Sequence, residues 1–403
     1  GFLPPLWAMA GSMIYALLPP VVAYASSSLE TPFYSLIGIL ALERTMRSLT
    51  QPKVRWQALA LACFSVIVRP DGAILLLVVG TTIGLIVFRE YWLQTHHWVG
   101  AARQTLGHLL LQLLPGVIIL VVGIGAHWLY YGTAFPNTLT AKANGYQIDL
   151  LRNAQNYLYQ MILAQPSGIP VYILAIIGAI VAFRQAPELL VFALWYVVYH
   201  VLFIARAPLF DWYLQVPLFA LSIFAGYGLA KVVQWALALA KQERREGLVS
   251  LAITALLAVA LGIANVPYDR GRYTLESNSE SVEGNLGRWL AAHSQPNDTV
   301  FTETLGFIGY YASHDAFIDW PGLSSKDATS VLSSADGQTR FRQYILLINH
   351  FEPRYLALRQ DEWDSLKPEL QPRYALCADF PAPDSPSGGY VVACHAGTST
   401  ASQ

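Results

Sequence analysis

Residues 104–142 read QTLGHLLLQLLPGVIILVVGIGAHWLYYGTAFPNTLTAK and contain no Asp, Glu, Lys or Arg before the final lysine. An apolar run of about 20 residues is long enough to cross the hydrocarbon core of a bilayer as one helix. The polar end of the stretch then places Asn137, Thr138 and Lys142 just beyond that span. An amide, a hydroxyl and a cation in this position are groups suited to a phosphate or a sugar.

The composition of the whole chain is typical of an integral membrane protein. Of its 403 residues 54% are apolar and only 13% are charged, whereas soluble domains carry about 25% charged residues; the mean hydropathy is +0.40. Residues 1–267 hold 15 Lys/Arg and 9 Asp/Glu, and residues 268–403 hold 10 and 17. This shift predicts a basic transmembrane domain at 1–267, an acidic soluble domain at 268–396 and a disordered tail at 397–403.

Nine runs of low charge are long or apolar enough to be considered as membrane spans. They are 1–22, 32–46, 56–69, 72–88, 105–130, 168–184, 188–205, 210–232 and 247–266. The second and third are short, so we expect them to be tilted, extended by snorkelling side chains, or broken. The chain starts at Gly1 in an already apolar segment without signal-peptide features, and we expect the native N-terminus to lie upstream.

The distribution of basic residues predicts how the spans alternate. If the chain breaks at Arg69-Pro70-Asp71-Gly72, eleven Lys/Arg fall in one set of loops and four in the other. Pro70 and Gly72 are helix breakers suited to that turn. The richer set is assigned to the cytoplasm, so this turn, the 131–167 loop and the C-terminal domain are expected to face outward.

Beyond residue 267 the pattern changes to that of a small α/β domain. Helices are predicted at Val282–His293, Lys326–Leu332, Arg340–His350 and Glu362–Lys367, the last stopped by Pro368. Strands are predicted at Thr299–Glu303, Ala316–Trp320, Arg354–Leu358, Arg373–Ala378 and Tyr390–Cys394. A hairpin of the last two strands would bring Cys377 near Cys394; a disulfide and two separate buried thiols are both open alternatives.

Two outward-facing segments carry acidic or basic candidates. Glu30 is the only acid in the first 42 residues and precedes Thr31-Pro32, so it is either a site residue or part of a helix start. Arg69 and Asp71 either pair with each other or let the arginine bind a phosphate through its planar guanidinium.

Aromatic residues accompany the other two segments. Tyr131 follows the long span and Trp212-Tyr213 begins a later one, just after Arg206. These rings are either substrate contacts or ordinary residues of the membrane-interface belt. In the soluble domain, Asp319 and Trp320 are either acceptor contacts or strand-end residues.

Several familiar chemistries have no support in the sequence. It contains no Walker loop, GxSxG, HExxH or CxxC motif, so use of a nucleotide sugar or ATP in the cytoplasm has no visible support. No cofactor is evident, and a divalent metal is possible but unsupported. Nothing resembles a nucleic-acid-binding patch.

The segments, in their order, resemble bacterial polytopic glycosyltransferases of the GT-C class. This group includes protein-mannosyltransferase-like and aminoarabinose-transferase-like enzymes, and the resemblance is greatest to the mycobacterial-type arabinofuranosyltransferases. It rests on Leu29-Glu30-Thr31-Pro32, Arg69-Pro70-Asp71-Gly72, Tyr131-Gly132, Pro136-Asn137-Thr138 with Ala141-Lys142, Asp211-Trp212-Tyr213 with Pro217, and in the soluble domain Gly306–Tyr311, Ile318-Asp319 and Gly322-Leu323.

The resemblance implies transfer of a sugar from a polyprenyl-phosphate donor to a glycan, lipid or protein outside the bacterial cytoplasmic membrane. Such enzymes place an essential acid in the first outward loop, which we expect upstream of Gly1, with Glu30 and Asp71 as candidates within the chain. Lys142 and Arg69 would bind the departing phosphate. Lys142→Ala is then expected to abolish transfer while leaving the protein folded.

The resemblance implies positioning roles for the other candidate residues. Asn137, Thr138 and Glu30 would hold the sugar, with Tyr131, Arg206, Trp212 and Tyr213 as further substrate contacts. The alternative function is a non-enzymatic transporter of lipid-linked glycans or a cell-envelope assembly scaffold. A transporter is expected to carry charges deep within its spans, whereas here the charges lie almost wholly at span ends.

Overall fold

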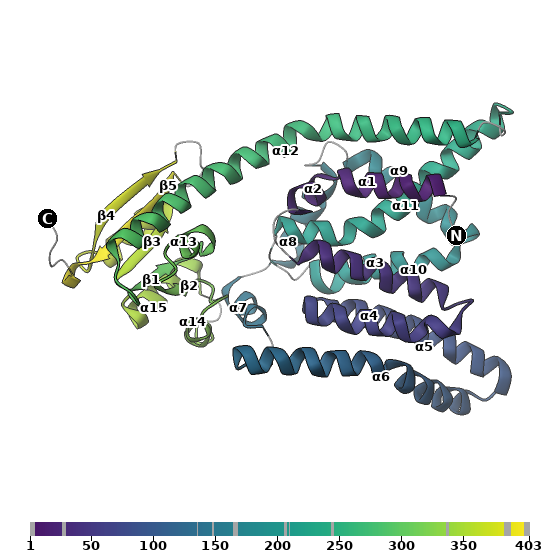
Figure 1. Cartoon of the computed structure of the whole chain (residues 1–403), viewed down its shortest axis with the longest axis horizontal. Coiled ribbons are helices and arrows are strands. Elements are labelled where there is room, and N and C mark those ends of the chain that lie inside the picture. Colours follow the sequence, from purple (N-terminus) through teal and green to yellow (C-terminus); the bar gives the residue numbers. More distant parts are fainter. Residues whose placement is uncertain are drawn as a thin grey trace. The chain divides into compact units, whose positions relative to one another are not determined.

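The computed structural model describes the chain except residues 1–4, 26–29, 135, 147–148, 164–167, 205–207, 209, 243–245, 336–337, 383–387 and 399–403, and except for the side chains of residues 5–7, 139, 143–144, 211, 246, 269, 272, 275–276 and 279. It forms two compact units (Figure 1). The first comprises residues 1–134 and 149–269, and the second comprises residues 135–148 and 270–403. The segment 135–148, expected from sequence as an outward loop of the membrane domain, belongs to the second unit.

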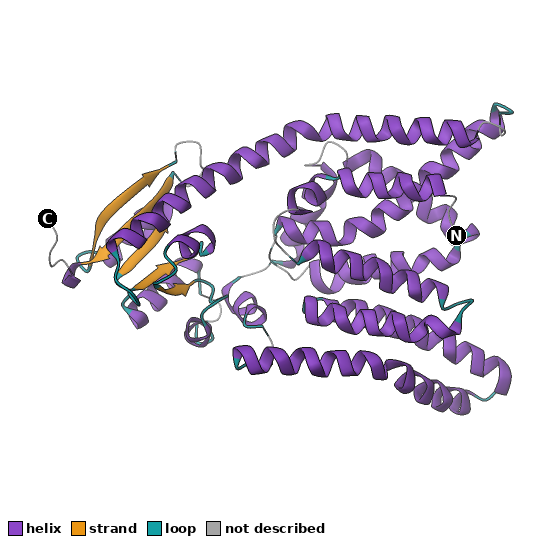
Figure 2. Cartoon of the chain, in the orientation of Figure 1, coloured by secondary structure: helices purple, strands orange, loops and turns teal. Residues whose placement is uncertain are grey.

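The described part of the first unit consists of helices and their connections (Figure 2). Its α-helices are α1 (Pro5–Leu17), α2 (Pro19–Ala25), α3 (Thr31–Arg47), α4 (Arg55–Val68), α5 (Gly72–Thr95), α6 (Trp98–Tyr131), α8 (Leu150–Leu158), α9 (Gly168–Gln185), α10 (Leu190–Tyr199), α11 (Asp211–Leu239) and the first part of α12 (Glu246–His293). Single π-helical turns follow α8 at Tyr159–Leu163 and α10 at His200–Ile204.

In its described residues, each predicted span overlaps helical structure, and the first overlaps two helices, α1 and α2. Within the described residues, six helical segments are long and apolar enough to cross a membrane, and α1 with α2 forms a seventh, bent by 70°. The two runs expected to be short are α3 and α4, with 17 and 14 residues. The predicted fold class, a helical multi-pass membrane protein with a small C-terminal α/β domain, is confirmed.

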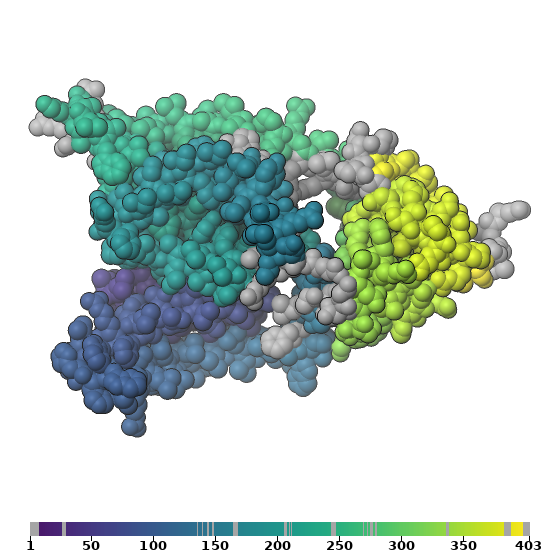
Figure 3. Space-filling model, turned by 180° about the vertical axis from the view of Figure 1, so that it is seen from behind, coloured from purple at the N-terminus to yellow at the C-terminus, as the bar shows by residue number. Residues whose placement is uncertain are grey.

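The surface of the first unit is apolar where it would meet lipid. Only 6% of an 18-residue apolar stretch of α6 is buried. Leu111, Val121 and Leu129 on this helix are 65% or more exposed. Figure 3 shows one face of the molecule in space-filling form, with the residues of this unit coloured from purple to green. So large an exposed aliphatic surface is stable in hydrocarbon rather than in water.

The centre of the unit is α11, in which 78% of an 18-residue apolar stretch is buried. It packs most closely on α9, where Gly178 and Gly228 face each other across the interface. A Cβ atom at either glycine would overlap the backbone of the opposite helix. The two glycines therefore allow the contact that holds α11 in the core.

The second unit is a five-stranded sheet with helices on both faces. Its strands are β1 (Thr299–Thr302), β2 (Ala316–Asp319), β3 (Tyr355–Arg359), β4 (Tyr374–Pro381) and β5 (Gly389–His395). Its helices are α7 (Thr138–Gly145), the end of α12, α13 (Gly306–Tyr311), α14 (Lys326–Leu332), α15 (Arg340–Phe351) and α16 (Gln360–Leu370). The strand order is β2-β1-β3-β5-β4, with β2, β1 and β3 parallel and β5 antiparallel to both β3 and β4.

Two apolar cores lie on opposite faces of this sheet. One includes Phe301, Leu356 and side chains from α14, α15 and α16; the other includes Val300, Ala357 and side chains from the end of α12 and from α13. The alternation along β1 and β3 follows from the two-residue period of a strand. The sheet is thus the middle layer of a three-layer α/β domain.

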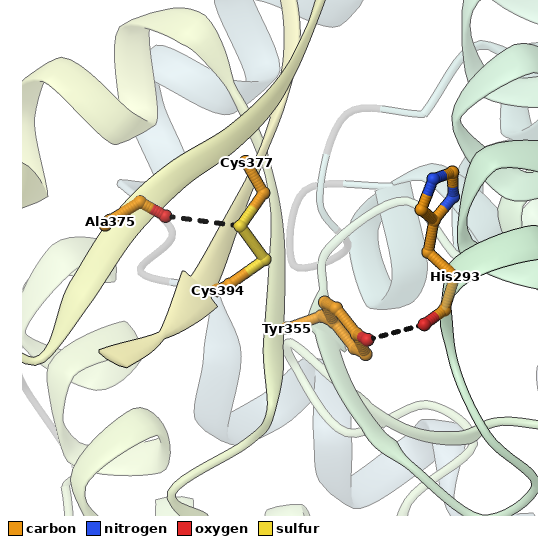
Figure 4. Close-up of a disulfide and its surroundings, with 5 residues drawn as sticks. All are labelled: His293, Tyr355, Ala375, Cys377 and Cys394. Atoms are coloured by element: carbon orange, nitrogen blue, oxygen red, sulfur yellow. Dashed lines mark hydrogen bonds between the residues drawn. A yellow bond between two sulfur atoms is a disulfide. The ribbon is translucent and has the colours of Figure 1, made fainter. Parts of the chain in front are cut away.

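The hairpin of β4 and β5 carries the disulfide that the sequence left open. Cys377 and Cys394 are bonded, with their Cα atoms 5.9 Å apart (Figure 4). A register irregularity between Leu376 and Ala378 places Cys377 at a bulge beside β5. The sequence prediction that Pro368 stops the preceding helix is wrong, because α16 continues to Leu370. Leu366 and Leu370 are buried in the core and hold this last turn in place.

Candidate functional site

The predicted break between α4 and α5 is a tight turn that fixes its own charged residues. Arg69 is the extended residue after α4, and Asp71 immediately precedes α5. Gly72 lies so close to the last turn of α4 that a Cβ atom there would overlap the carbonyl group of Ser65. Proline and glycine therefore place Arg69 and Asp71 on the same side of the turn.

Arg69 is buried and uses three guanidinium nitrogens. Its Nε and Nη2 donate to the two carboxylate oxygens of Asp71 at 2.9 and 3.3 Å, a bidentate pairing. Its Nη1 donates to Thr31 Oγ1 at 2.7 Å and lies 3.3 Å from Glu30 Oε1. The turn is thereby joined to the start of α3, and two of the predicted segments form one cluster.

Three tyrosines enclose this cluster. Tyr199 from α10 donates to Asp71 Oδ2 at 2.8 Å. The rings of Tyr34 and Tyr213 lie 5.4 and 5.2 Å from Arg69 Cζ, within the range of cation–π attraction. Tyr34, Tyr199 and Tyr213 are all less than 5% exposed. We name Glu30, Thr31, Tyr34, Arg69, Asp71, Tyr199 and Tyr213 the Arg69 cluster.

The two acids of the Arg69 cluster differ in accessibility. The Asp71 side chain is 3% exposed and already accepts from Arg69 and Tyr199. The Glu30 side chain is 50% exposed, with one oxygen turned to Arg69. Asp71 is therefore suited to hold the arginine, whereas Glu30 is the carboxylate that a substrate could reach.

An aromatic group adjoins the cluster through Tyr213. Trp212 stacks on Phe210 with ring centroids 4.4 Å apart, and Tyr213 contacts Phe203 edge to face at 4.9 Å. The predicted site residue Arg206 and the side chain of Asp211 lie outside the described residues. The part of this segment that is described thus supplies rings beside the charged cluster.

The polar segment after α6, which carries Asn137, Thr138 and Lys142, belongs to the second unit. Asn137 Nδ2 donates to the carbonyl oxygen of Gly322 and to Thr329 Oγ1, the latter at 2.8 Å. Thr138 begins α7, and Lys142 is half-buried in its last turn. Asn137 thus has a clear structural contact, and its role toward a substrate stays a prediction.

Tyr131 ends α6 and is 65% exposed. Its ring packs against His127 and Tyr130, with centroids 4.7 and 4.6 Å away. This exposed aromatic end is typical of a helix at a membrane interface. Its predicted contact with substrate stays a prediction.

Asp319 and Trp320 fit the structural alternative. Asp319 is 2% exposed and accepts hydrogen bonds from the backbone N–H groups of residues 323–325 and from the Ser324 hydroxyl. Trp320 is 3% exposed and donates through Nε1 to Gln343 Oε1 at 2.7 Å. Both side chains therefore have structural contacts: Asp319 stabilises the loop after β2, and Trp320 bonds to α15.

Tyr34 and Tyr199 are the residues of the Arg69 cluster that sequence analysis missed. Each lies in an apolar helical run, where an aromatic residue is most often part of the core. The only sequence signal for Tyr34 is its position one turn after Thr31 in α3. In the described part of the chain, no group of three or more His, Cys, Asp or Glu is placed to hold a metal ion.

One comparison with known proteins matches the second unit, and another covers most of the chain. A family model described as a domain of unknown function (DUF8728) matches residues 270–399, which lie in the second unit. No curated protein matches the chain. Among solved structures, the chain is similar to the apo crystal structure of ArnT from Cupriavidus metallidurans, at 12% identity and a TM-score of 0.43, over 93% of this chain and 84% of that one.

Proposed function

We propose that the protein is a membrane glycosyltransferase that moves a sugar from a polyprenyl-phosphate donor to an acceptor outside the bacterial cytoplasmic membrane. The second unit would then face the extracytoplasmic side. The observation that carries the proposal is the accessible Glu30 carboxylate beside the buried pair of Arg69 and Asp71. The order of the sequence segments supports the same class.

Glu30 has the features of a general base. Its carboxylate is half-exposed, and Arg69 restrains one oxygen while leaving the side chain accessible. A base must lie within hydrogen-bond reach of the hydroxyl that it deprotonates. In the proposed reaction Glu30 takes the proton of the acceptor hydroxyl, the hydroxyl oxygen bonds to the anomeric carbon, and the bond from that carbon to the polyprenyl phosphate breaks.

Arg69 and its buried partners act as positioning residues in this proposal. Asp71 holds the guanidinium by two hydrogen bonds, and Tyr199 in turn holds Asp71. Because the arginine is fixed before substrate arrives, little reorganisation is needed when charge develops nearby. The expected role of Lys142 toward a phosphate stays a prediction from sequence, since this residue belongs to the second unit.

The aromatic residues next to the cluster suit the apolar parts of such a substrate. Phe210 and Trp212 stack on each other, and Tyr213 connects them to Arg69. Aromatic faces pack against sugar rings and isoprenoid chains without needing a hydrogen-bond partner for every atom. This explains why the charged cluster is bordered by rings rather than by further polar side chains.

The test uses a product that is common to all donors. The full chain in lipid nanodiscs is incubated with a panel of polyprenyl-phosphate hexoses and pentoses and a mixed glycan acceptor, and released polyprenyl phosphate is measured. We expect Glu30→Gln to lower release roughly 10²–10⁴-fold, the usual contribution of general base catalysis. Glu43→Gln is the matched control, because Glu43 lies in α3, the helix that Glu30 immediately precedes, and pairs with Arg44 and Arg47.

Each outcome of this assay decides something. Normal release by Glu43→Gln with loss in Glu30→Gln supports the proposed role of Glu30. Equal release by wild type and Glu30→Gln assigns the base to another group. No release from any donor by folded wild-type protein, checked by its thermal unfolding, contradicts the proposed activity and favours the scaffold or transporter alternative.

A further inference from the structure

The second unit contains a partly buried chain of oxygen atoms at the carboxyl ends of its parallel strands. Glu283 Oε1 lies 3.0 Å from Tyr390 Oη, which lies 2.9 Å from Thr304 Oγ1. Thr304 Oγ1 lies 3.0 Å from Glu303 Oε2. Arg359 adds a donor at the far end, with Nη2 3.1 Å from Thr304 Oγ1 and 2.5 Å from Glu303 Oε2.

A count of protons shows what this chain requires. Its three oxygen-to-oxygen contacts each need one hydrogen atom, but the Thr304 and Tyr390 hydroxyls supply only two. With both acids ionised, one of the three contacts brings two oxygens together without a hydrogen between them. A third proton on one of the two carboxyl groups completes all three hydrogen bonds.

The surroundings of the acids decide which one holds that proton. Glu303 is paired with Arg359 at 2.5 Å, which favours its ionised form. Glu283 is 7% exposed, and within the described residues no ion pair includes it. A buried carboxyl group without a cation partner favours its neutral form. Glu283 is therefore the acid that carries the proton.

We propose that Glu283 is protonated in the folded protein and that its ionisation is a pH switch for the packing of α12 on the sheet. In the protonated state Glu283 donates to Tyr390, Tyr390 donates to Thr304, and Thr304 donates to Glu303. When Glu283 loses its proton, Tyr390 turns its O–H to the new carboxylate. The hydroxyl of Thr304 then has to leave Glu303 or lose its contact with Tyr390.

The charges around Glu283 agree with this assignment. Burial raises the pKa of Glu283 to about 7, although the Tyr390 hydrogen bond and the Arg359 charge lower it; Glu303 raises it further. These groups face Glu283 from β5, from the end of β3 and from the residue after β1. Ionisation of Glu283 is thus expected near neutral pH.

The packing of α12 gives the switch a structural consequence. Leu286 and Leu290, on the same helix as Glu283, lie in the core formed with Val300 and Val392. The carboxyl group of Glu283 is the polar contact of this helix with β5. A negative charge at that position places an ion against an apolar helix–sheet interface, so ionisation weakens the docking of α12.

The sign of the pH dependence follows from proton linkage. The folded state raises the pKa of Glu283 above its ordinary value, so at intermediate pH the folded protein binds more protons than the unfolded chain. The contribution of Glu283 to stability is therefore fully present below the ordinary pKa of a glutamate, falls as pH rises, and levels off above about pH 7. Glu283→Gln, whose amide can donate to Tyr390, is expected to abolish this fall.

The experiment uses the full chain in nanodiscs and two measurements. Infrared difference spectra between about pH 5 and pH 8 are expected to show a protonated carboxyl band that disappears with a midpoint near neutrality, outside the ordinary range of glutamates. Glu283→Gln should lack that band, and Glu280→Gln, an exposed residue of the same helix, should keep it. The temperature of thermal unfolding should fall with rising pH in wild type and Glu280→Gln, and fall less in Glu283→Gln, which keeps Asp315, another acid whose pKa is raised by burial.

Two results would overturn the proposal. One is the persistence of the near-neutral carboxyl band in Glu283→Gln, which would assign the proton to a different acid. The other is a pH dependence of unfolding in Glu283→Gln equal to that of the wild type. If Glu283→Gln does not fold, Tyr390→Phe provides the second variant, because removal of the Tyr390 donor should move the midpoint of the carboxyl band to higher pH.

Discussion

Arg69 in the first unit and Arg359 in the second each bind two carboxylates and a threonine hydroxyl and lie next to tyrosine rings. Each cluster contains one more acid than base: the first has one arginine and two acids, and the second has Arg340 and Arg359 with Glu283, Glu303 and Glu362. The clusters differ in where the extra acid lies.

In the first unit the extra acid is Glu30, whose half-exposed side chain can be solvated. In the second unit it is Glu283, which is buried and keeps its proton in our proposal. The same excess of one acid therefore gives an accessible carboxylate in one unit and a buried neutral acid in the other. The position of the extra acid therefore decides whether a cluster offers a reactive group or a pH-dependent contact.

The largest expected effect is that of Arg69→Ala. The substitution removes the cation from Asp71, whose side chain is 3% exposed and cannot be solvated instead. Breaking a buried ion pair on one side costs about 3–5 kcal/mol. The measurement is the free energy of unfolding of the full chain in detergent micelles. Arg69→Lys is the control, since it keeps the charge but loses the bidentate geometry, and its cost should be smaller; equal costs for both variants would contradict the importance of charge at this position.

Arg359→Ala is expected to cost less. The Arg359 side chain is 26% exposed, its partner Glu303 is 22% exposed, and Glu362 has a second cation, Arg340, at 2.9 Å. We expect a loss of about 1–3 kcal/mol in the free energy of unfolding, the usual cost of leaving a partly buried polar group unpaired. A loss as large as that of Arg69→Ala would mean that exposure does not distinguish the two clusters.

The sequence predicts those parts of the Arg69 cluster that depend on local structure. Pro70 and Gly72 mark the turn, and the charges on either side of Pro70 lie only two residues apart. The partners that complete the cluster could not be predicted. Tyr199 is 128 residues away from Asp71 in an apolar helix, and only the packing of α10 beside α5 brings it close.

The same distinction explains the second unit. Alternating apolar residues and turn signals predict the five strands and most helices, because these patterns are local. The pairing of β1 with both β2 and β3, which gathers Thr304 and Arg359 at one edge, is a property of the sheet order. The contacts of Asn137 could not be predicted for a comparable reason, since its partners Gly322 and Thr329 lie more than 180 residues away in the sequence.

The smallest effects separate the two clusters most clearly. Thr31 and Thr304 each accept a hydrogen bond from the arginine of their cluster, so Thr31→Val and Thr304→Val should each cost about 1 kcal/mol. Only Thr304 also links Glu303 to Tyr390. Without the Thr304 hydroxyl, Tyr390 can donate to Glu283 alone, which stabilises the ionised acid and lowers its pKa. When the free energy of unfolding is measured against pH, the midpoint of its fall should shift to lower pH in Thr304→Val and stay unchanged in Thr31→Val. An unshifted midpoint in both variants would contradict the coupling of Glu283 to the Thr304 hydroxyl.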